Sequence, residues 1–173
     1  MGARIAAHFA NAGFPVDLLD ITLPDHPNRN AAALAGIESA AKQKPVGFFT
    51  DAAKALITPG NFDDHLERVA RCDWIIEAVA ENLLIKRRLW SKVAELRTPG
   101  SVVSTNTSGI PLAHISDGFD VEFRRHFLGT HFFNPPRYLH LVEVIPGADT
   151  SAAVLEWASE LCDLHLGKGV VRC

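Results

Sequence analysis

The sequence has few of the features that mark several large classes of protein. Only three cysteines, Cys72, Cys162 and Cys173, occur among 173 residues, too few and too scattered for a disulfide framework or a paired-cysteine metal site. No apolar run approaches the roughly 20 residues that cross a bilayer. The net charge is only −3, so the basic surface of a nucleic-acid-binding protein is missing. We therefore expect a cytoplasmic protein with no membrane span and no nucleic-acid partner.

Apolar residues are plentiful, and their spacing predicts an α/β fold. They make up 47% of a chain whose length suits one domain. The nearly unbroken apolar run at 73–79 is typical of a parallel strand buried on both faces. Strands that alternate with helices indicate a mostly parallel, Rossmann-like sheet with helices on both faces. The predicted strands are 15–19, 73–79, 101–105, 128–133, 141–145 and 169–172, and the predicted helices are 1–12, 31–44, 52–57, 63–71, 83–96 and 151–164.

Two of these helices carry finer predictions. Pro59 and Gly60 predict a turn that ends the helix at 52–57. On the helix at 83–96, we expect Lys86 and its basic neighbours to lie away from the apolar side. That apolar side is expected to consist of Ile85, Leu89, Val93 and Leu96.

A histidine and a glutamate stand in two neighbouring apolar runs. Residues 128–133 and 141–145 predict two strands joined by a turn at Pro135-Pro136. Glu143 is costly to bury inside an apolar strand without a partner, and His131 is the available partner. A histidine held by a carboxylate keeps one tautomer and gains basicity, as a general base acting on an alcohol requires. A purely structural His–Glu pair at the end of the sheet is the alternative.

The first residues of the chain match part of a dinucleotide-binding βαβ unit. A helix of small residues at 1–12 is expected to end in a cap formed by Gly13, and the next strand leads to Asp20. In such a unit a glycine-rich turn opens the helix, and an acidic residue roughly 20 positions later accepts from the ribose 2′-hydroxyl. Gly2 and Asp20 have this spacing, which favours NAD because the carboxylate repels the 2′-phosphate of NADP. An ordinary capped helix and a turn aspartate are the alternatives.

Other polar residues follow predicted strands, where open α/β sheets bind their ligands. Glu81 follows one buried strand, and Asn106 and Ser108 follow the next. Asn106 and Ser108 are suited to orient a substrate oxygen, or else they form Asx and Ser turns. Lys86 is placed to reach cofactor hydroxyls, or else it is an ordinary solvated lysine.

Together these motifs resemble the NAD-binding domain of the L-3-hydroxyacyl-CoA dehydrogenases, in the family's order and over nearly the whole chain. The matches are Met1-Gly2, Asp20, Ile76-Glu77-Ala78-Val79-Ala80-Glu81-Asn82 with Lys86, Asn106-Thr107-Ser108, His131-Phe132-Phe133-Asn134-Pro135 and Leu141-Val142-Glu143-Val144-Ile145. The run from His131 to Glu143 also resembles the long multifunctional branch, which carries a fused enoyl-CoA hydratase-type domain.

The resemblance implies a reaction and a role for each matching residue. The family oxidises L-3-hydroxyacyl-CoA to 3-ketoacyl-CoA with NAD, in fatty-acid β-oxidation. His131 is then the base that removes the 3-hydroxyl proton, and Glu143 orients it and stabilises its charge. Ser108 and Asn134 help to hold the substrate and the histidine. The residues implied for the cofactor are Gly2, Asp20, Glu81, Lys86 and Asn106, and no metal is implied.

The resemblance also implies an acyl-CoA partner and a larger assembly. Residues 31–57 would form an arm that meets coenzyme A, with Lys42 and Lys44 near its phosphates. The family's first strand and first two glycines have no counterpart here, and its C-terminal helical domain, which forms a homodimer, would follow Cys173. We therefore interpret residues 1–173 as an N-terminally truncated NAD-binding domain, and we expect these residues alone to fold poorly and to be inactive.

Other functions stay open beside this one. A related dehydrogenase with a non-CoA substrate fits the same motifs. A catalytically inactive NAD-binding module and an S-adenosylmethionine methyltransferase fit less well, because neither gives a reason for the pair of His131 and Glu143. A zinc site built from His126, His131 and His140 lacks the spacing of a helical ligand pair.

Overall fold

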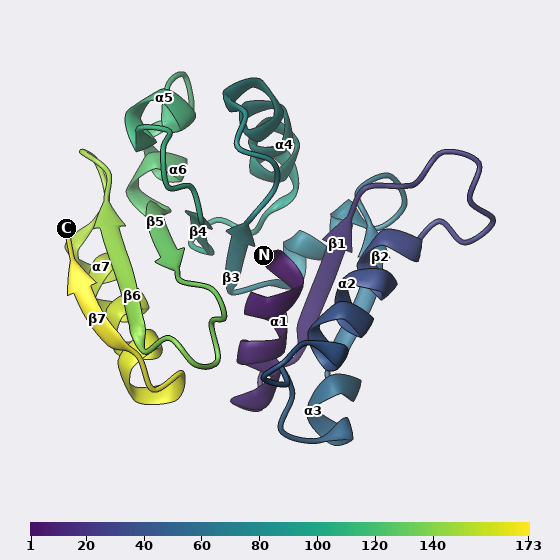
Figure 1. The fold of residues 1–173 in the computed structure, drawn as a ribbon. Helices are drawn as coiled ribbons and strands as arrows, with labels where there is room; N and C mark the ends of the chain where they lie inside the picture. The colour runs from purple at the N-terminus through teal and green to yellow at the C-terminus, as the bar shows by residue number, and fades with distance from the viewer. The chain divides into compact units, whose positions relative to one another are not determined.

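The computed structural model describes all residues from Met1 to Cys173 and divides them into two compact units (Figure 1). The first unit contains Met1–Arg68 and the segment Asn134–Leu139, and the second contains Val69–Phe133 and His140–Cys173. Each unit has its own sheet, of two strands in the first and five in the second. The predicted α/β class with a largely parallel sheet is confirmed.

The first unit is a parallel two-stranded sheet with three helices. Its elements in chain order are α1 (Gly2–Asn11), β1 (Val16–Asp20), α2 (Ala31–Lys42), α3 (Asp51–Ala55) and β2 (Ile57–Asn61). β1 and β2 pair from Val16 opposite Ile57 to Asp20 opposite Asn61. β1 has no other strand neighbour within residues 1–173.

Small side chains let α1 and α2 approach closely. At Gly36 of α2, a Cβ atom would lie only 2.9 Å from the Cβ of Ala3 on α1. Close packing without voids is what stabilises such an interior, since each methyl group contributes through the surface that it removes from water. The buried core of this unit consists of Ala6, Ala7, Ala10, Ile37, Ala40, Phe48, Ala53 and Ile57.

The end of α1 confirms the predicted glycine cap. Gly13 has a φ of +90°, the left-handed conformation that glycine adopts at low cost. Its N–H bonds to the carbonyl of Ala10, and the N–H of Phe14 bonds to the carbonyl of Phe9. The rings of Phe9 and Phe14 lie 6.0 Å apart, so the apolar contact that accompanies this type of helix end is also present.

The turn predicted at Pro59 and Gly60 is wrong, because these residues lie inside β2. α3 already ends at Ala55. β2 pairs with β1 alone and is therefore an edge strand, where the missing N–H of Pro59 costs no ladder hydrogen bond. Gly60 leaves room for its neighbour, since a Cβ there would lie 2.6 Å from Leu19 Cδ2 and the leucine side chain would have to shift.

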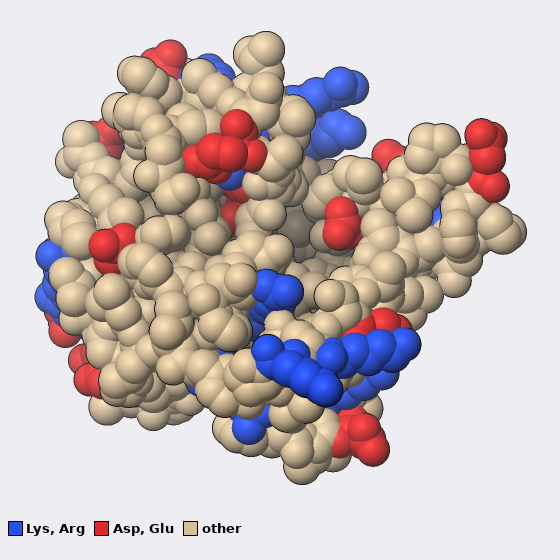
Figure 2. Space-filling view, viewed as in Figure 1, with Lys and Arg blue, Asp and Glu red and all other residues tan.

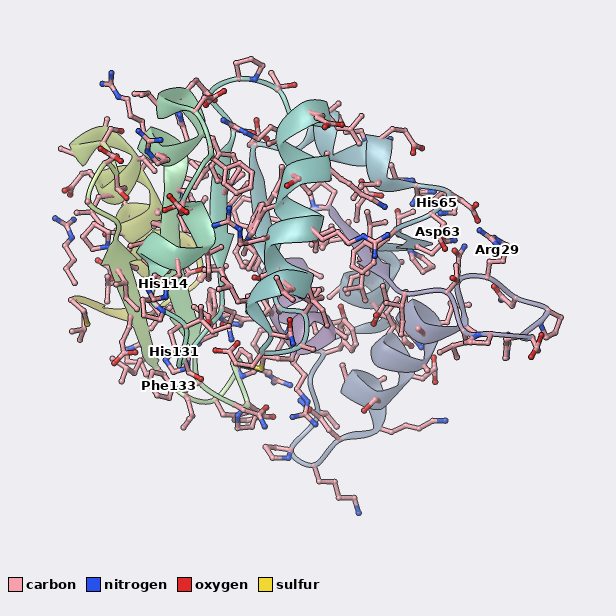
Figure 3. All side chains as sticks on the ribbon, turned by 90° about the horizontal axis from the view of Figure 1, so that it is seen from above. Arg29, Asp63, His65, His114, His131 and Phe133 are labelled. Carbon is pink, nitrogen blue, oxygen red and sulfur yellow. The ribbon has the colours of Figure 1, made fainter.

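The helix predicted at 63–71 is shorter than expected and is a 3-10 helix, η1 (Leu66–Arg71). The buried Asn61 side chain organises the residues that precede η1. Its carboxamide oxygen accepts from the N–H groups of Asp63 and Asp64. Its amide nitrogen donates to Asn30 and to Asp64. Arg29 forms ion pairs with both aspartates, and Figure 3 shows Arg29 beside Asp63.

The second unit has a five-stranded sheet in the order β3-β4-β5-β6-β7. Its elements are β3 (Trp74–Glu77), α4 (Leu83–Leu96), β4 (Val102–Thr105), α5 (Leu112–Ser116), α6 (Val121–His126), β5 (Phe127–Phe132), β6 (Leu141–Pro146), α7 (Ala152–Glu160) with a π-helical turn (Leu161–His165), and β7 (Gly169–Arg172). All pairs are parallel except β5 with β6. The short helices α5 and α6 carry too few residues for a periodic pattern and were not predicted.

The buried face of α4 differs from the predicted one. Ile85 and Leu96 are exposed, whereas Lys86, Trp90 and Val93 are buried. Trp90 makes edge-to-face contacts with the rings of Phe123 and Phe127, an aromatic cluster that outweighs the aliphatic stripe. None of the helices is long and apolar enough to cross a bilayer.

Gly13 offers a test of the backbone conformation at the end of α1. Nothing lies within 4 Å of a Cβ atom placed there, so replacement costs only backbone strain. We expect Gly13→Ala to lower the free energy of unfolding by about 1–2 kcal/mol. Gly13→Asn should lower it less, because asparagine tolerates a positive φ. Urea unfolding of the full-length wild type and of the two variants measures this, and an equal loss in both variants would contradict it.

Candidate active site

His131 and Glu143 face each other across the antiparallel strands β5 and β6. They are register partners, and His131 Nδ1 lies 2.8 Å from Glu143 Oε2. The contact predicted from the two apolar runs is therefore present. Both side chains are half-buried, with 21% of the histidine side chain and 32% of the glutamate side chain exposed.

His131 is the one residue of β5 that is open to solvent. All its strand neighbours are buried, including Thr130 and Phe132 on either side. The ring centroids of Phe133 and His131 lie 4.5 Å apart, and Figure 3 shows the two residues next to each other. Nε2 makes no hydrogen bond within the protein, while Glu143 holds Nδ1. This arrangement favours the tautomer with the proton on Nδ1 and leaves Nε2 as a proton acceptor.

Asn106 ties the end of β4 to the end of β5. Its side-chain oxygen accepts from the N–H of Phe132 at 2.8 Å, and its own N–H donates to the carbonyl of Glu77. The residue thus holds the backbone next to His131. Ser108 follows in an exposed loop, with its N–H 3.2 Å from Glu81 Oε1 and its hydroxyl without a protein partner.

A buried ion pair that the sequence did not reveal lies beneath this loop. Lys86 Nζ is 2.8 Å from Glu77 Oε1, and the two side chains are 1% and 2% exposed. The alternative of a solvated Lys86 is wrong. Glu77 carries the same signal as Glu143, a carboxylate inside an apolar strand, and could have been found by it. A contact between Lys86 and cofactor hydroxyls stays a prediction.

Glu81 organises the loop that carries Ser108. Its Oε1 accepts from the hydroxyl of Thr107 and from the N–H groups of Ser108 and Gly109, and its Oε2 lies 3.3 Å from Lys86 Nζ. Burial alone would raise the pKa of this carboxyl. The hydrogen bonds from Thr107 and Gly109 and the charge of Lys86 outweigh it and lower the pKa to about 2.

Gly2, Asp20 and Asn134 belong to the first unit. Gly2 begins α1, and Asp20 ends β1. Asp20 Oδ1 accepts from the N–H of Ile21 at 2.8 Å, which leaves the other carboxylate oxygen as an acceptor for a ligand. The side-chain oxygen of Asn134 accepts from Arg4 at 2.7 Å. The roles expected for these three residues stay predictions.

The structure bears on two further predictions, the basic arm at residues 31–57 and the alternative of a zinc site. Lys42 and Lys44 are both exposed, and Figure 2 shows basic side chains gathered in the region of α3.

No three histidine, cysteine, aspartate or glutamate side chains gather as metal ligands. His126 Nδ1 lies 2.9 Å from the carbonyl of Glu122 on its own helix, so it is engaged locally. The zinc site considered from the sequence has no support.

Comparison with known proteins identifies similar chains. The family profile described as "3-hydroxyacyl-CoA dehydrogenase, NAD binding domain" matches residues 1–173. A probable 3-hydroxyacyl-CoA dehydrogenase from Deinococcus radiodurans is 48% identical over 171 residues, which are 99% of this chain and 49% of that protein. A putative fatty acid oxidation complex trifunctional enzyme from Rickettsia felis is 35% identical, over 100% of this chain and 24% of that protein.

A solved structure agrees with these sequence matches. The 3-hydroxybutyryl-CoA dehydrogenase from Escherichia coli K12 superimposes with a TM-score of 0.78 at 31% identity, over 100% of this chain and 36% of that chain. The chain therefore spans about half, or less, of the length of these relatives.

Glu81 predicts a specific dependence of stability on pH. Its pKa is about 2 in the folded protein, against roughly 4.3 in an unfolded chain. The folded state therefore binds fewer protons between these values, and the stabilisation is complete above about pH 5 and is lost as the pH falls towards 2. We expect the difference in unfolding free energy between wild type and Glu81→Gln to shrink over this range.

Urea unfolding of the full-length protein and its variant at several pH values between 6 and 2.5 measures that difference. Glu95→Gln is the matched control, since Glu95 is exposed on α4 and forms no ion pair. A difference for Glu81→Gln that does not change with pH would contradict the assignment.

Proposed function

Because the chain belongs to the family of NAD-binding domains of 3-hydroxyacyl-CoA dehydrogenases, we propose that its protein oxidises L-3-hydroxyacyl-CoA to 3-ketoacyl-CoA with NAD. The single observation that supports this most is the contact of His131 with Glu143, which leaves Nε2 open to a ligand. We propose that this reaction is part of fatty-acid β-oxidation in the cytoplasm. The name of the Rickettsia felis relative, a putative fatty acid oxidation complex trifunctional enzyme, supports the pathway. A homodimer of the full-length protein is part of the same proposal.

His131 acts as the general base. Its Nε2 takes the proton of the 3-hydroxyl group as the hydrogen on C3 leaves with its electron pair. The imidazole becomes positively charged in this step, and Glu143 stabilises that charge at 2.8 Å while it holds the ring in place. General acid–base assistance of this kind contributes roughly 10²–10⁴-fold to a rate.

NAD, when bound, supplies the hydride acceptor. Asp20 suits its adenosine ribose, because one carboxylate oxygen is free at the end of β1, next to the strand end where such folds bind the ribose. Gly2 at the start of α1 suits the phosphates. Glu81 and Asn106 are proposed to contact the nicotinamide ribose. Glu81 holds the loop after β4, and Asn106 accepts from the N–H of Phe132, the residue after His131.

Ser108 and Asn134 are proposed to hold the substrate. The Ser108 hydroxyl has no protein partner and lies in the loop after β4, in the same unit as His131. Coenzyme A is proposed to meet the arm of α2 and α3, where Lys42 and Lys44 are exposed. A dehydrogenase with a non-CoA substrate, or an inactive module, is the outcome if CoA substrates are not turned over.

The first test is turnover of acetoacetyl-CoA with NADH by the full-length protein. His131→Ala should lower kcat/KM by roughly 10²–10⁴-fold while NADH still binds. His140→Ala is the matched control, since His140 is exposed and lies outside the proposed site. Wild-type protein that binds NADH but does not turn over acetoacetyl-CoA would contradict the proposal.

Glu143 should act only through His131. We expect Glu143→Gln to lower kcat, because the uncharged amide stabilises the protonated imidazole less. In the double variant with His131→Ala, the Glu143→Gln change should cost nothing further, since residues that work as a unit are not additive. Losses that multiply in the double variant would show that Glu143 has a separate role.

Asp20 should determine the choice between NADH and NADPH. Asp20→Asn removes the charge that repels a 2′-phosphate, so the ratio of kcat/KM for NADH over NADPH should fall by roughly 10–100-fold, the equivalent of one charged hydrogen bond. Asp25→Asn, in the exposed loop after β1, is the matched control. An unchanged ratio in Asp20→Asn would exclude this role.

A further inference from the structure

Glu77 is a buried carboxylate that the proposed reaction does not use. It ends β3 and is 4% exposed. Its oxygens accept from the Thr105 hydroxyl at 2.6 Å, from the Val79 N–H at 2.7 Å, and from Lys86 Nζ at 2.8 and 3.1 Å. So many donors around a buried carboxylate hold it in a single position.

Lys86 joins this carboxylate to a second one. Its ammonium group lies 2.8 Å from Glu77 and 3.3 Å from Glu81 Oε2, and its side chain is 1% exposed. Glu77 is buried with it, whereas 42% of the Glu81 side chain is exposed. The buried pair is therefore the fixed end, and Glu81 is the end that it restrains.

Glu81 passes this restraint to the loop after β4. Its other oxygen receives the Thr107 hydroxyl and the N–H groups of Ser108 and Gly109. The start of the same loop is held directly by Glu77, through Thr105. A chain of contacts therefore runs from the buried carboxylate of β3 to the backbone that carries the Ser108 hydroxyl.

We propose that Glu77 is a positioning residue for the substrate: through Lys86 it holds Glu81 against the loop 107–109 and so sets the place of the Ser108 hydroxyl. This inference rests on the proposed function, in which Ser108 contacts the acyl-CoA. Its distinctive consequence is that removing the charge of Glu77, at unchanged shape, loosens a loop that the Glu77 carboxylate contacts directly only through Thr105, the residue before it.

The kinetic test compares Glu77→Gln with wild type in the turnover of acetoacetyl-CoA by the full-length protein. We expect KM for acetoacetyl-CoA to rise roughly tenfold or more, and by a larger factor than KM for NADH, because Ser108 is the group displaced most directly. In a Ser108→Ala background, Glu77→Gln should raise KM no further, since the group that it positions is gone. An equal rise in both backgrounds would overturn the proposal. Glu95→Gln is the control for removing a glutamate charge from this unit.

Hydrogen exchange gives a readout that needs no activity. Glu77→Gln should lower the protection of the Ser108 and Gly109 amides at least tenfold, while the amides of β5 keep theirs. Unchanged protection in Glu77→Gln would overturn the proposal whatever the kinetics. Lost protection, together with wild-type protein that does not turn over acetoacetyl-CoA, would refute the proposed function and leave Glu77 as the residue that positions the loop.

Should Glu77→Gln fail to fold, Glu77→Gln with Lys86→Met removes both buried charges and avoids a stranded ammonium group. The double variant leaves Glu81 without its anchor. It should therefore show the same lost protection at Ser108 and Gly109, and normal protection there would overturn the proposal.

Discussion

The antiparallel register of β5 and β6 is the constraint on which the candidate site depends. It places His131 opposite Glu143, and it does so inside a sheet whose other pairs are parallel. Because side chains alternate between the faces of a strand, a slip of one residue would turn His131 to the other face and bury it. The buried side chains of Thr130 and Phe132 resist such a slip, since each would then be exposed in its place.

Near this pair of residues, a buried ion pair holds a loop of the candidate site in place. Glu77 at the end of β3 and Lys86 in the first turn of α4 are almost fully buried, and an unpaired charge is costly in such a place. Their pairing is tolerated because every lone pair and donor finds a partner. The structural consequence is that Glu81 and the loop with Ser108 are held beside the strand that carries His131.

Glycine and proline are used where the packing demands them. Gly13 has a positive φ at the end of α1, and Gly60 of β2 leaves space for the side chain of Leu19 on β1. The second case explains why a turn was predicted there: Pro59 and Gly60 are turn residues in most contexts. An edge strand tolerates both, because one of its sides forms no ladder. Only the pairing of β2 with β1 alone reveals that context.

The sequence by itself determined the α/β class, most strands, the end of α1 and the meeting of His131 with Glu143, because these follow from local periodicity and from the cost of a carboxylate in an apolar strand. It did not determine which face of α4 is buried or that Lys86 lies between Glu77 and Glu81. Those outcomes depend on residues distant in the chain, the aromatic cluster around Trp90 and the strand ends that surround the ammonium group. Tertiary packing decided them, because burial is a property of the whole core and not of any one segment.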